Sequence, residues 1–218
     1  MIDWHHIDTV LLDMDGTLLD LAYDNWFWLQ HVPQEYARAN QMRPDEAHKL
    51  IAEWIHRHHG TLNWYCLDFW SDELKLDIAA MKRHTQERIA VRPGTLEFLD
   101  RLKASGRTVI LATNAHRGAL DVKLDRSGIR PYFHEIVSSH DYGAAKETAG
   151  FWEALQQHHP FTPGAALFID DSLPVLHAAD HYGIGHLACI RHPDSSQPPR
   201  ANTDPYPGID RWQDVLPT

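Results

Sequence analysis

Two carboxylates and a glycine follow the first apolar run of the chain. Asp13 and Asp15 stand at the end of the run that begins at Thr9, and Gly16 behind them allows a sharp turn. One carboxylate of such a pair can attack an electrophile while the other delivers and collects a proton. Because Asp-Gly also marks ordinary turns, an acidic turn is the alternative for this pair taken alone.

A second acidic pair, Asp170 and Asp171, ends another apolar run, which begins at Ala165. Two adjacent carboxylates beside a buried run are costly unless a cation or hydrogen-bond donors meet them. This cost favours a functional pair over the alternative, a helix N-cap.

Three further polar residues stand at comparable places. Thr113 and Asn114 end the run that begins at Thr108, where a hydroxyl can donate to a phosphoryl oxygen or, alternatively, cap a helix. Lys146 can supply a positive charge, and an ordinary solvated lysine is its alternative. Each of these three residues alone is weak evidence for a functional site. The functional interpretation depends on the two acidic pairs that accompany them.

The carboxylates also predict a metal. Gathered at one place they repel one another, so the set requires a cation. Oxygen ligands without His or Cys favour Mg²⁺ over Zn²⁺. We therefore expect a Mg²⁺ site with ligands from both acidic pairs, Asp13, Asp15, Asp170 and Asp171.

Alternating strands and helices are predicted to position these groups. Five short apolar segments have the character of buried parallel strands: 9–13, 108–113, 136–137 (the weakest), 165–170 and 186–190. Helical spacing of apolar residues occupies 96–103, 120–124, 152–156 and 175–182. This alternation predicts an α/β fold, a doubly wound parallel sheet whose ligands bind at the carboxyl ends of the strands.

Residues 20–92 interrupt the alternation. The segment has helical patterns without a strand, and it holds five of the eight Trp residues. We expect a helical cap at 20–92, inserted into an α/β catalytic core formed by 1–19 and 93–218. The tail from His192 onward, rich in Pro, Ser and Asp, is predicted to be irregular, with Trp212 as a candidate for docking on the core.

Aromatic residues of the cap allow two interpretations. Trp64 and Trp70 are spaced for one face of a helix, and Tyr65 belongs to a second face. These side chains either pack the core of the cap or stack on a nucleobase above the site. Asn63 and Asp68 are candidates for contacts with the edge of such a base.

Composition and charge exclude several other classes. The net charge of −10 and the scattered Lys and Arg residues argue against nucleic acid as a partner. No apolar run reaches the length of about 18 residues needed to cross a membrane, and no secretory leader is visible. Two distant cysteines predict no disulfide and favour the cytoplasm. Among the 17 His residues, the pairs at 5–6, 58–59 and 158–159 show no zinc-ligand spacing and are expected at the surface.

The order of the motifs resembles the haloacid dehalogenase superfamily. DxDGT, Thr, Lys and Asp-Asp follow one another with an insert after the first motif, across residues 8–194. More narrowly, TVLLDMDGTLLDL (9–21), TLNWYCLDFW (61–70) and LFIDDS (167–172) are similar to bacterial purine 5′-nucleotidases active on GMP and IMP. The sequence departs from many of these relatives at Ala145, where they carry Pro before the motif lysine.

This resemblance implies a Mg²⁺-dependent phosphomonoester hydrolase that acts through an aspartyl phosphate. It implies that Asp13 is the nucleophile, that Asp15 is the acid and base, and that Thr113 and Lys146 bind the phosphoryl oxygens. It implies a Mg²⁺ ion held by Asp13, the main-chain oxygen of Asp15 and Asp171, with Asp170 bound directly or through water. The implied substrate is a small phosphorylated metabolite, a nucleoside monophosphate, in contact with Thr113, Asn114, Lys146, Asn63, Trp64 and Tyr65.

Other functions compete with this one. A sugar-phosphate phosphatase or a phosphomutase would carry the same first motif. A non-catalytic binding module would have lost Asp13 or Lys146, and both are present. Dehalogenases of the superfamily lack a second Asp in the first motif, so Asp15 argues against dehalogenation.

Overall fold

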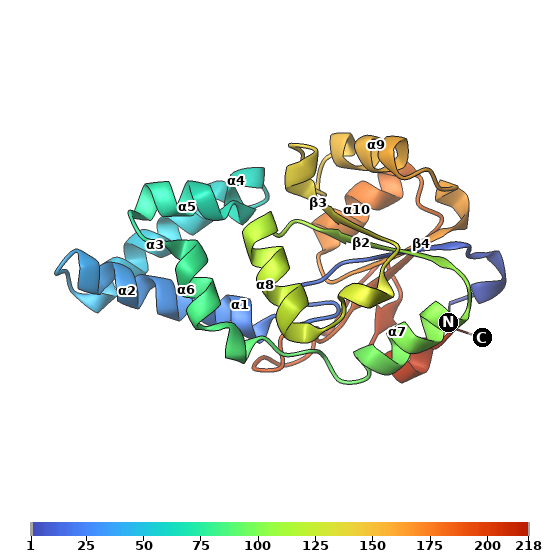
Figure 1. Cartoon of the computed structure of the whole chain (residues 1–218), viewed down its shortest axis with the longest axis horizontal. Coiled ribbons are helices and arrows are strands. Elements are labelled where there is room, and N and C mark those ends of the chain that lie inside the picture. Colours follow the sequence, from blue (N-terminus) through green and yellow to red (C-terminus); the bar gives the residue numbers. More distant parts are fainter. Residues whose placement is uncertain (1, 218) are drawn as a thin grey trace.

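A parallel sheet with helices on both faces forms the larger part of the molecule (Figure 1). The computed structural model describes residues 2–217, and within them the strand order is β3-β2-β1-β4-β5-β6, with every neighbouring pair parallel. The strands are β1 Thr9–Leu12, β2 Thr108–Thr113, β3 Glu135–Ser138, β4 Ala166–Asp170, β5 His186–Ile190 and β6 Gly208–Ile209. The predicted doubly wound α/β fold is confirmed.

Two apolar layers cover the sheet. Its helices are α7 Thr95–Ala104, α8 Arg117–Ser127, α9 Ala149–His158 and α10 Leu173–Tyr182. On β1, Val10 and Leu12 pack in the core shared with α7 and α8, whereas Leu11 packs in the core shared with α9 and α10. Because every residue of β1 and β4 is buried, these strands read as continuous apolar runs rather than alternating ones.

A helical insert, residues 22–88, lies between β1 and α7 (Figure 1). Its helices are α1 Ala22–Trp26, the π-helical η2 Phe27–His31, α2 Val32–Ala39, α3 Pro44–His58, α4 Leu62–Tyr65, α5 Leu67–Leu74, α6 Ile78–His84 and the 3-10 turn η3 Gln86–Arg88. The insert meets the core where α6 packs against α8. Across residues 2–217, no helix has the length and apolar character needed to cross a membrane.

The aromatic segment of the insert is not one helix, and the prediction of shared faces was wrong. Cys66 has an extended backbone (φ −84°, ψ 113°) that separates α4 from α5. Trp64 and Trp70 therefore lie on different helices, where the indole N–H of Trp70 donates to the main-chain oxygen of Trp64 at 2.8 Å. Trp70 is buried in the core, whereas Trp64 remains partly exposed.

The C-terminal tail is more ordered than its composition predicts. Two of its residues form β6, and the 3-10 turn η7, Trp212–Val215, packs under α7. The Trp212 ring is 1% exposed and stacks on Phe98, with ring centroids 4.2 Å apart. A strand of two residues carries too little periodicity to be recognised in a sequence rich in turn-forming residues.

We predict that Trp212→Ala lowers the free energy of unfolding by about 3–5 kcal/mol, because it removes a fully buried ring from the core. Urea denaturation of the purified protein measures this change. The matched control is Leu96→Ala, which shortens a side chain that is 46% exposed on α7 and should change stability by less than about 0.5 kcal/mol. Equal effects of the two substitutions would show that the tail does not dock in solution.

Candidate active site

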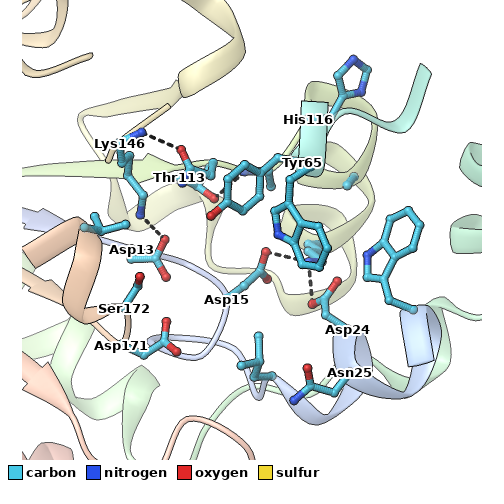
Figure 2. A pocket seen from close by; sticks show the side chains of 18 of the residues that line it. Asp13, Asp15, Asp24, Asn25, Tyr65, Thr113, His116, Lys146, Asp171 and Ser172 are labelled. Atoms are coloured by element: carbon cyan, nitrogen blue, oxygen red, sulfur yellow. Dashed lines mark hydrogen bonds and ion pairs between the residues drawn. The ribbon is translucent and has the colours of Figure 1, made fainter. Parts of the chain in front are cut away.

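Three strands deliver the predicted motifs to one edge of the sheet. Strand β1 pairs with β2 on one side and with β4 on the other, in a register that matches Leu12 with Leu111 and with Ile169. The next residues along these strands therefore lie side by side at the carboxyl edge. Two of them, Asp13 and Asp170, carry carboxylates. Figure 2 shows the resulting group of acidic side chains.

Lys146 lies between two of these carboxylates. Its Nζ donates to Asp13 Oδ1 at 2.5 Å, to Asp170 Oδ2 at 2.7 Å and to the main-chain oxygen of Ala112 at 3.0 Å. Burial lowers the pKa of Lys146, but the two carboxylates outweigh burial and raise it above its usual value. Burial raises the pKa of Asp13, and the ammonium group opposes that rise. Lys146 therefore stays charged and holds the two acids together.

Asp171 completes a group of three carboxylates. One oxygen from each of Asp13, Asp170 and Asp171 lies within 4.8 Å of the others. Burial, followed by the charge of Asp170, raises the pKa of Asp171 to about 7. An all-oxygen donor set of this kind suits a hard divalent cation. The structure thus brings the predicted acidic ligands to one place.

Gly16 is required by the approach of Asp171. Its backbone has φ +84°, which favours glycine, and a Cβ built there would lie 2.7 Å from the Asp171 carboxyl carbon. A side chain at this position would therefore displace the carboxylate.

Asp15 has one bound and one free carboxylate oxygen. Oδ2 forms an ion pair with Lys123 at 2.7 Å. Oδ1 is buried without a hydrogen-bond partner among residues 2–217, and the side chain lines the same cavity as Asp13 (Figure 2). Burial raises the pKa of Asp15, Lys123 lowers it, and the net shift is upward. A carboxyl group with a raised pKa and a free oxygen is suited to proton transfer.

The Asn114 side chain forms hydrogen bonds with Lys146 and with the next residue, Glu147. Its side-chain oxygen accepts from the Lys146 main-chain N–H at 2.9 Å, and its Nδ2 donates to Glu147 at 2.9 Å. The Tyr65 hydroxyl, from the insert, donates to the other oxygen of Glu147 at 2.7 Å. Thr113 is buried beside them, and its hydroxyl oxygen accepts from a main-chain N–H, which leaves the hydroxyl proton available.

A cavity of about 300 Å³ lies between the acidic group and the insert. This volume is at the lower end of the range of small-molecule sites, which is roughly 300–1,000 Å³. Its walls on the side of the insert include Trp28, Leu29, His59, Trp64, Tyr65 and Lys82. Asn63 and Asp68, expected at a base edge, are exposed and do not line the cavity, so the structure does not support that expectation.

Comparison with known proteins identifies the family. A family model for haloacid dehalogenase-like hydrolases matches residues 7–181. The chain is 41% identical over 217 residues to the GMP/IMP nucleotidase YrfG of Escherichia coli (strain K12), a match that covers 100% of this chain and 97% of that protein. The chain belongs to the haloacid dehalogenase-like hydrolases. The resemblance seen in the sequence motifs is confirmed.

Two further proteins are similar to this chain at lower sequence identity. The pyrimidine 5′-nucleotidase YjjG of E. coli (strain K12) is 22% identical over 162 residues, which cover 69% of this chain and 71% of that protein. Among solved structures, a HAD phosphatase from Thermococcus onnurineus superposes with a TM-score of 0.78 at 21% identity and 96% coverage of both chains. At this identity the structural match supports the shared fold only.

A buried charge network that the sequence analysis missed joins this hydrolase site to the insert. Asp24, on α1, lies 2.7 Å from Lys123 and 2.9 Å from Lys82. Burial raises the pKa of Asp24, but the two lysines outweigh burial and hold it at about 2. Through Lys123 the network reaches Asp15 (Figure 2). No short motif marks these residues, because they come from three separate helices.

The tail also reaches the acidic group. Arg200 donates to the main-chain oxygen of Asp171 and, at 3.3 Å, to its carboxylate. Asn25, on α1, donates to Asp194 of the tail at 2.6 Å. Arg200 was not recognised in the sequence, since one arginine in an irregular segment carries no positional signal.

We predict that Mg²⁺ raises the melting temperature of the chelator-treated protein more at about pH 8 than at about pH 5.5. At the lower pH, Asp171 with its pKa of about 7 holds a proton and cannot bind the cation. Without metal, the pKa of Asp171 is about 7 in the folded state and has its ordinary value of 3.8 in the unfolded state. The contribution of Asp171 to stability therefore decreases as the pH rises from about 3.8 to about 7.

Calorimetry with and without Mg²⁺ at both pH values measures this difference. Asp171→Asn should remove most of the gain, and the exposed Asp125→Asn should leave it unchanged. A gain of equal size at both pH values would contradict the assignment of Asp171 as a cation ligand.

Proposed function

We propose that this hydrolase is a Mg²⁺-dependent phosphatase of purine nucleoside 5′-monophosphates, of the GMP and IMP class. The observation that carries the proposal is the free oxygen of Asp15 in the same cavity as Asp13. A nucleophile beside a poised proton donor fits the displacement of an alkoxide leaving group. The similarity to the nucleotidase YrfG supports the choice of substrate.

The proposed reaction has two displacements at phosphorus. In the first, a carboxylate oxygen of Asp13 bonds to phosphorus as the bond to the ribose oxygen breaks, and Asp15 gives its proton to that oxygen. In the second, a water molecule attacks phosphorus and transfers a proton to Asp15. The bond to Asp13 then breaks and inorganic phosphate leaves. Lys146 and the Thr113 hydroxyl are positioned to neutralise and orient the transferring group.

The oxygen donor set fits a magnesium ion. Asp13, Asp170, Asp171 and the main-chain oxygen of Asp15 would hold it. When bound, Mg²⁺ reduces the repulsion between the anionic nucleophile and the phosphate. The pKa shifts support this role, because the raised values of Asp13 and Asp171 reflect buried negative charge without a sufficient counter-charge.

The walls of the cavity on the insert support a substrate with an aromatic base. Trp28 and Trp64 line the space opposite the acidic group, and His59 lies beside Trp64 with ring centroids 5.3 Å apart. A purine offers a larger stacking area than a pyrimidine, and stacking contributes about 1–3 kcal/mol per base. Tyr65 has a different role in this proposal, since its hydroxyl is bound to Glu147.

Asp13→Asn should reduce kcat by at least about a thousandfold, because an amide cannot form the acyl phosphate. A continuous assay of phosphate release from IMP with Mg²⁺ measures the loss. Asp13→Ala excludes recovery by deamidation, and the exposed Asp125→Asn should keep full activity. Turnover of Asp13→Ala within tenfold of the wild type would refute the role of Asp13.

The substrate proposal predicts that kcat/KM for IMP and GMP exceeds that for CMP by about ten- to a hundredfold, the range that stacking supplies. Trp64→Ala should reduce that difference. Tyr65→Phe is the matched control, since it keeps an aromatic ring and should leave the base preference unchanged.

Equal values of kcat/KM for IMP, CMP and a small sugar phosphate would favour the alternative, a sugar-phosphate phosphatase. A phosphomutase would instead require a bisphosphate activator and release little phosphate.

A further inference from the structure

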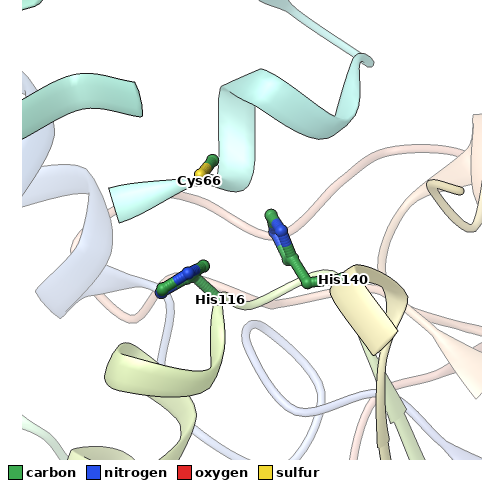
Figure 3. A group of neighbouring side chains, drawn as sticks. All are labelled: Cys66, His116 and His140. Carbon is green, nitrogen blue, oxygen red and sulfur yellow. The ribbon is translucent and has the colours of Figure 1, made fainter. Parts of the chain in front are cut away.

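Cys66, His116 and His140 meet at the contact between the helical insert and the core (Figure 3). Cys66 joins α4 to α5 in the insert, His116 precedes α8, and His140 lies in the turn that follows β3. One ligand atom of each residue lies within 4.8 Å of the other two. The reaction proposed above uses none of these three side chains.

The ring nitrogen Nε2 of His140 has no partner in the described part of the chain, although it is buried. A buried nitrogen without a hydrogen bond is unfavourable, and a bound ion is one way to satisfy it. The His116 ring lies edge-on to it, with centroids 5.0 Å apart. Burial, and then His116, lower the pKa of His140 to about 4, so the ring is neutral at neutral pH. Neutral imidazole is the form that binds metals.

The other two residues can also bind a metal from their present places. The Cys66 sulfur accepts the Phe69 main-chain N–H at 3.4 Å at the start of α5, a contact that a thiolate retains. His116 Nδ1 accepts from Gly118 N at 3.3 Å. Binding through Nε2 moves the ring proton to Nδ1, so it breaks this long bond and replaces the contact of Nε2 with Asp68. Asp68 has a carboxylate oxygen 3.6 Å from His116 Nε2 and offers a further oxygen donor beside the three residues.

We propose that Cys66, His116 and His140 bind one zinc ion that clamps the insert onto the core. A thiolate with two imidazoles is a soft donor set that selects Zn²⁺ over Mg²⁺. With bonds of about 2.0–2.3 Å, tetrahedral ligands lie about 3.3–3.8 Å apart, so ligand atoms that lie within 4.8 Å of one another need to approach by at most about 1.0–1.5 Å. Movement of the side chains and a small closure of the insert supply this approach.

The clamp has a consequence for turnover. His116 lines the cavity that holds the acidic group, so the zinc site is next to the path between the insert and the core. Substrate entry and product release require that the insert and the core separate, as with other lids over active sites. Zinc that bridges the two parts therefore slows turnover without displacing Mg²⁺ from the carboxylates.

Cobalt titration tests the site without any assay of activity, so its outcome is independent of the proposed function. With Mg²⁺ in excess, Co²⁺ added to the wild type should produce a near-ultraviolet thiolate-to-cobalt absorption that stops increasing at one equivalent of Co²⁺. Added Zn²⁺ should remove this absorption. Cys66→Ser should abolish this absorption, and His140→Ala should weaken cobalt binding at least tenfold. Cys189→Ser is the matched control and should behave as the wild type, because Cys189 is the other free cysteine. The site is refuted if the wild type lacks the absorption or if Cys66→Ser retains it.

Inhibition tests the clamp. With Mg²⁺ in excess, Zn²⁺ should lower kcat of the wild type, and Cys66→Ser and His140→Ala should need at least tenfold more Zn²⁺ for the same loss. Serine keeps an oxygen acceptor for Phe69 N–H, and a melting temperature measured without metal confirms that the variant is folded. Equal inhibition of all three proteins would place the inhibitory zinc at the carboxylates and refute the clamp.

Discussion

Burial of negative charge at the carboxyl edge of the sheet is the constraint on which the rest of this structure depends. Two buried lysines divide four of the acids into two ion clusters, Asp13–Lys146–Asp170 and Asp15–Lys123–Asp24. The DxD motif contributes one carboxylate to each cluster, so the two clusters are fixed relative to each other by three residues of chain. Removal of Lys146 would leave Asp13 and Asp170 without a paired lysine, and removal of Lys123 would leave Asp15 without one, which is strongly destabilising.

Each cluster is tied to the helical insert by a different contact. The first is linked through Asn114 and Glu147 to the hydroxyl of Tyr65. The second extends through Asp24 to Lys82, whose ammonium group also lies 4.2 Å from the centre of the Phe27 ring. Direct polar contacts therefore connect the insert to both clusters.

The C-terminal tail stabilises the same region from the other side. Arg200 reaches Asp171, and Trp212 is stacked in the core under α7. A segment that lacks the periodicity of regular structure thus supplies both a counter-charge for the acidic group and an apolar anchor.

The sequence by itself determined the strands that are buried on both faces and the acids that end them, because continuous apolar runs and the DxDGT and Asp-Asp motifs are local signals. It also indicated the superfamily. Tertiary structure alone decided which distant residues meet: Lys123 with Asp15, and Cys66 with two histidines. It also placed Asn63 outside the cavity, although Trp64 and Tyr65 of the same helix line it. Contacts between separate helices depend on packing geometry, and no spacing along the chain encodes them.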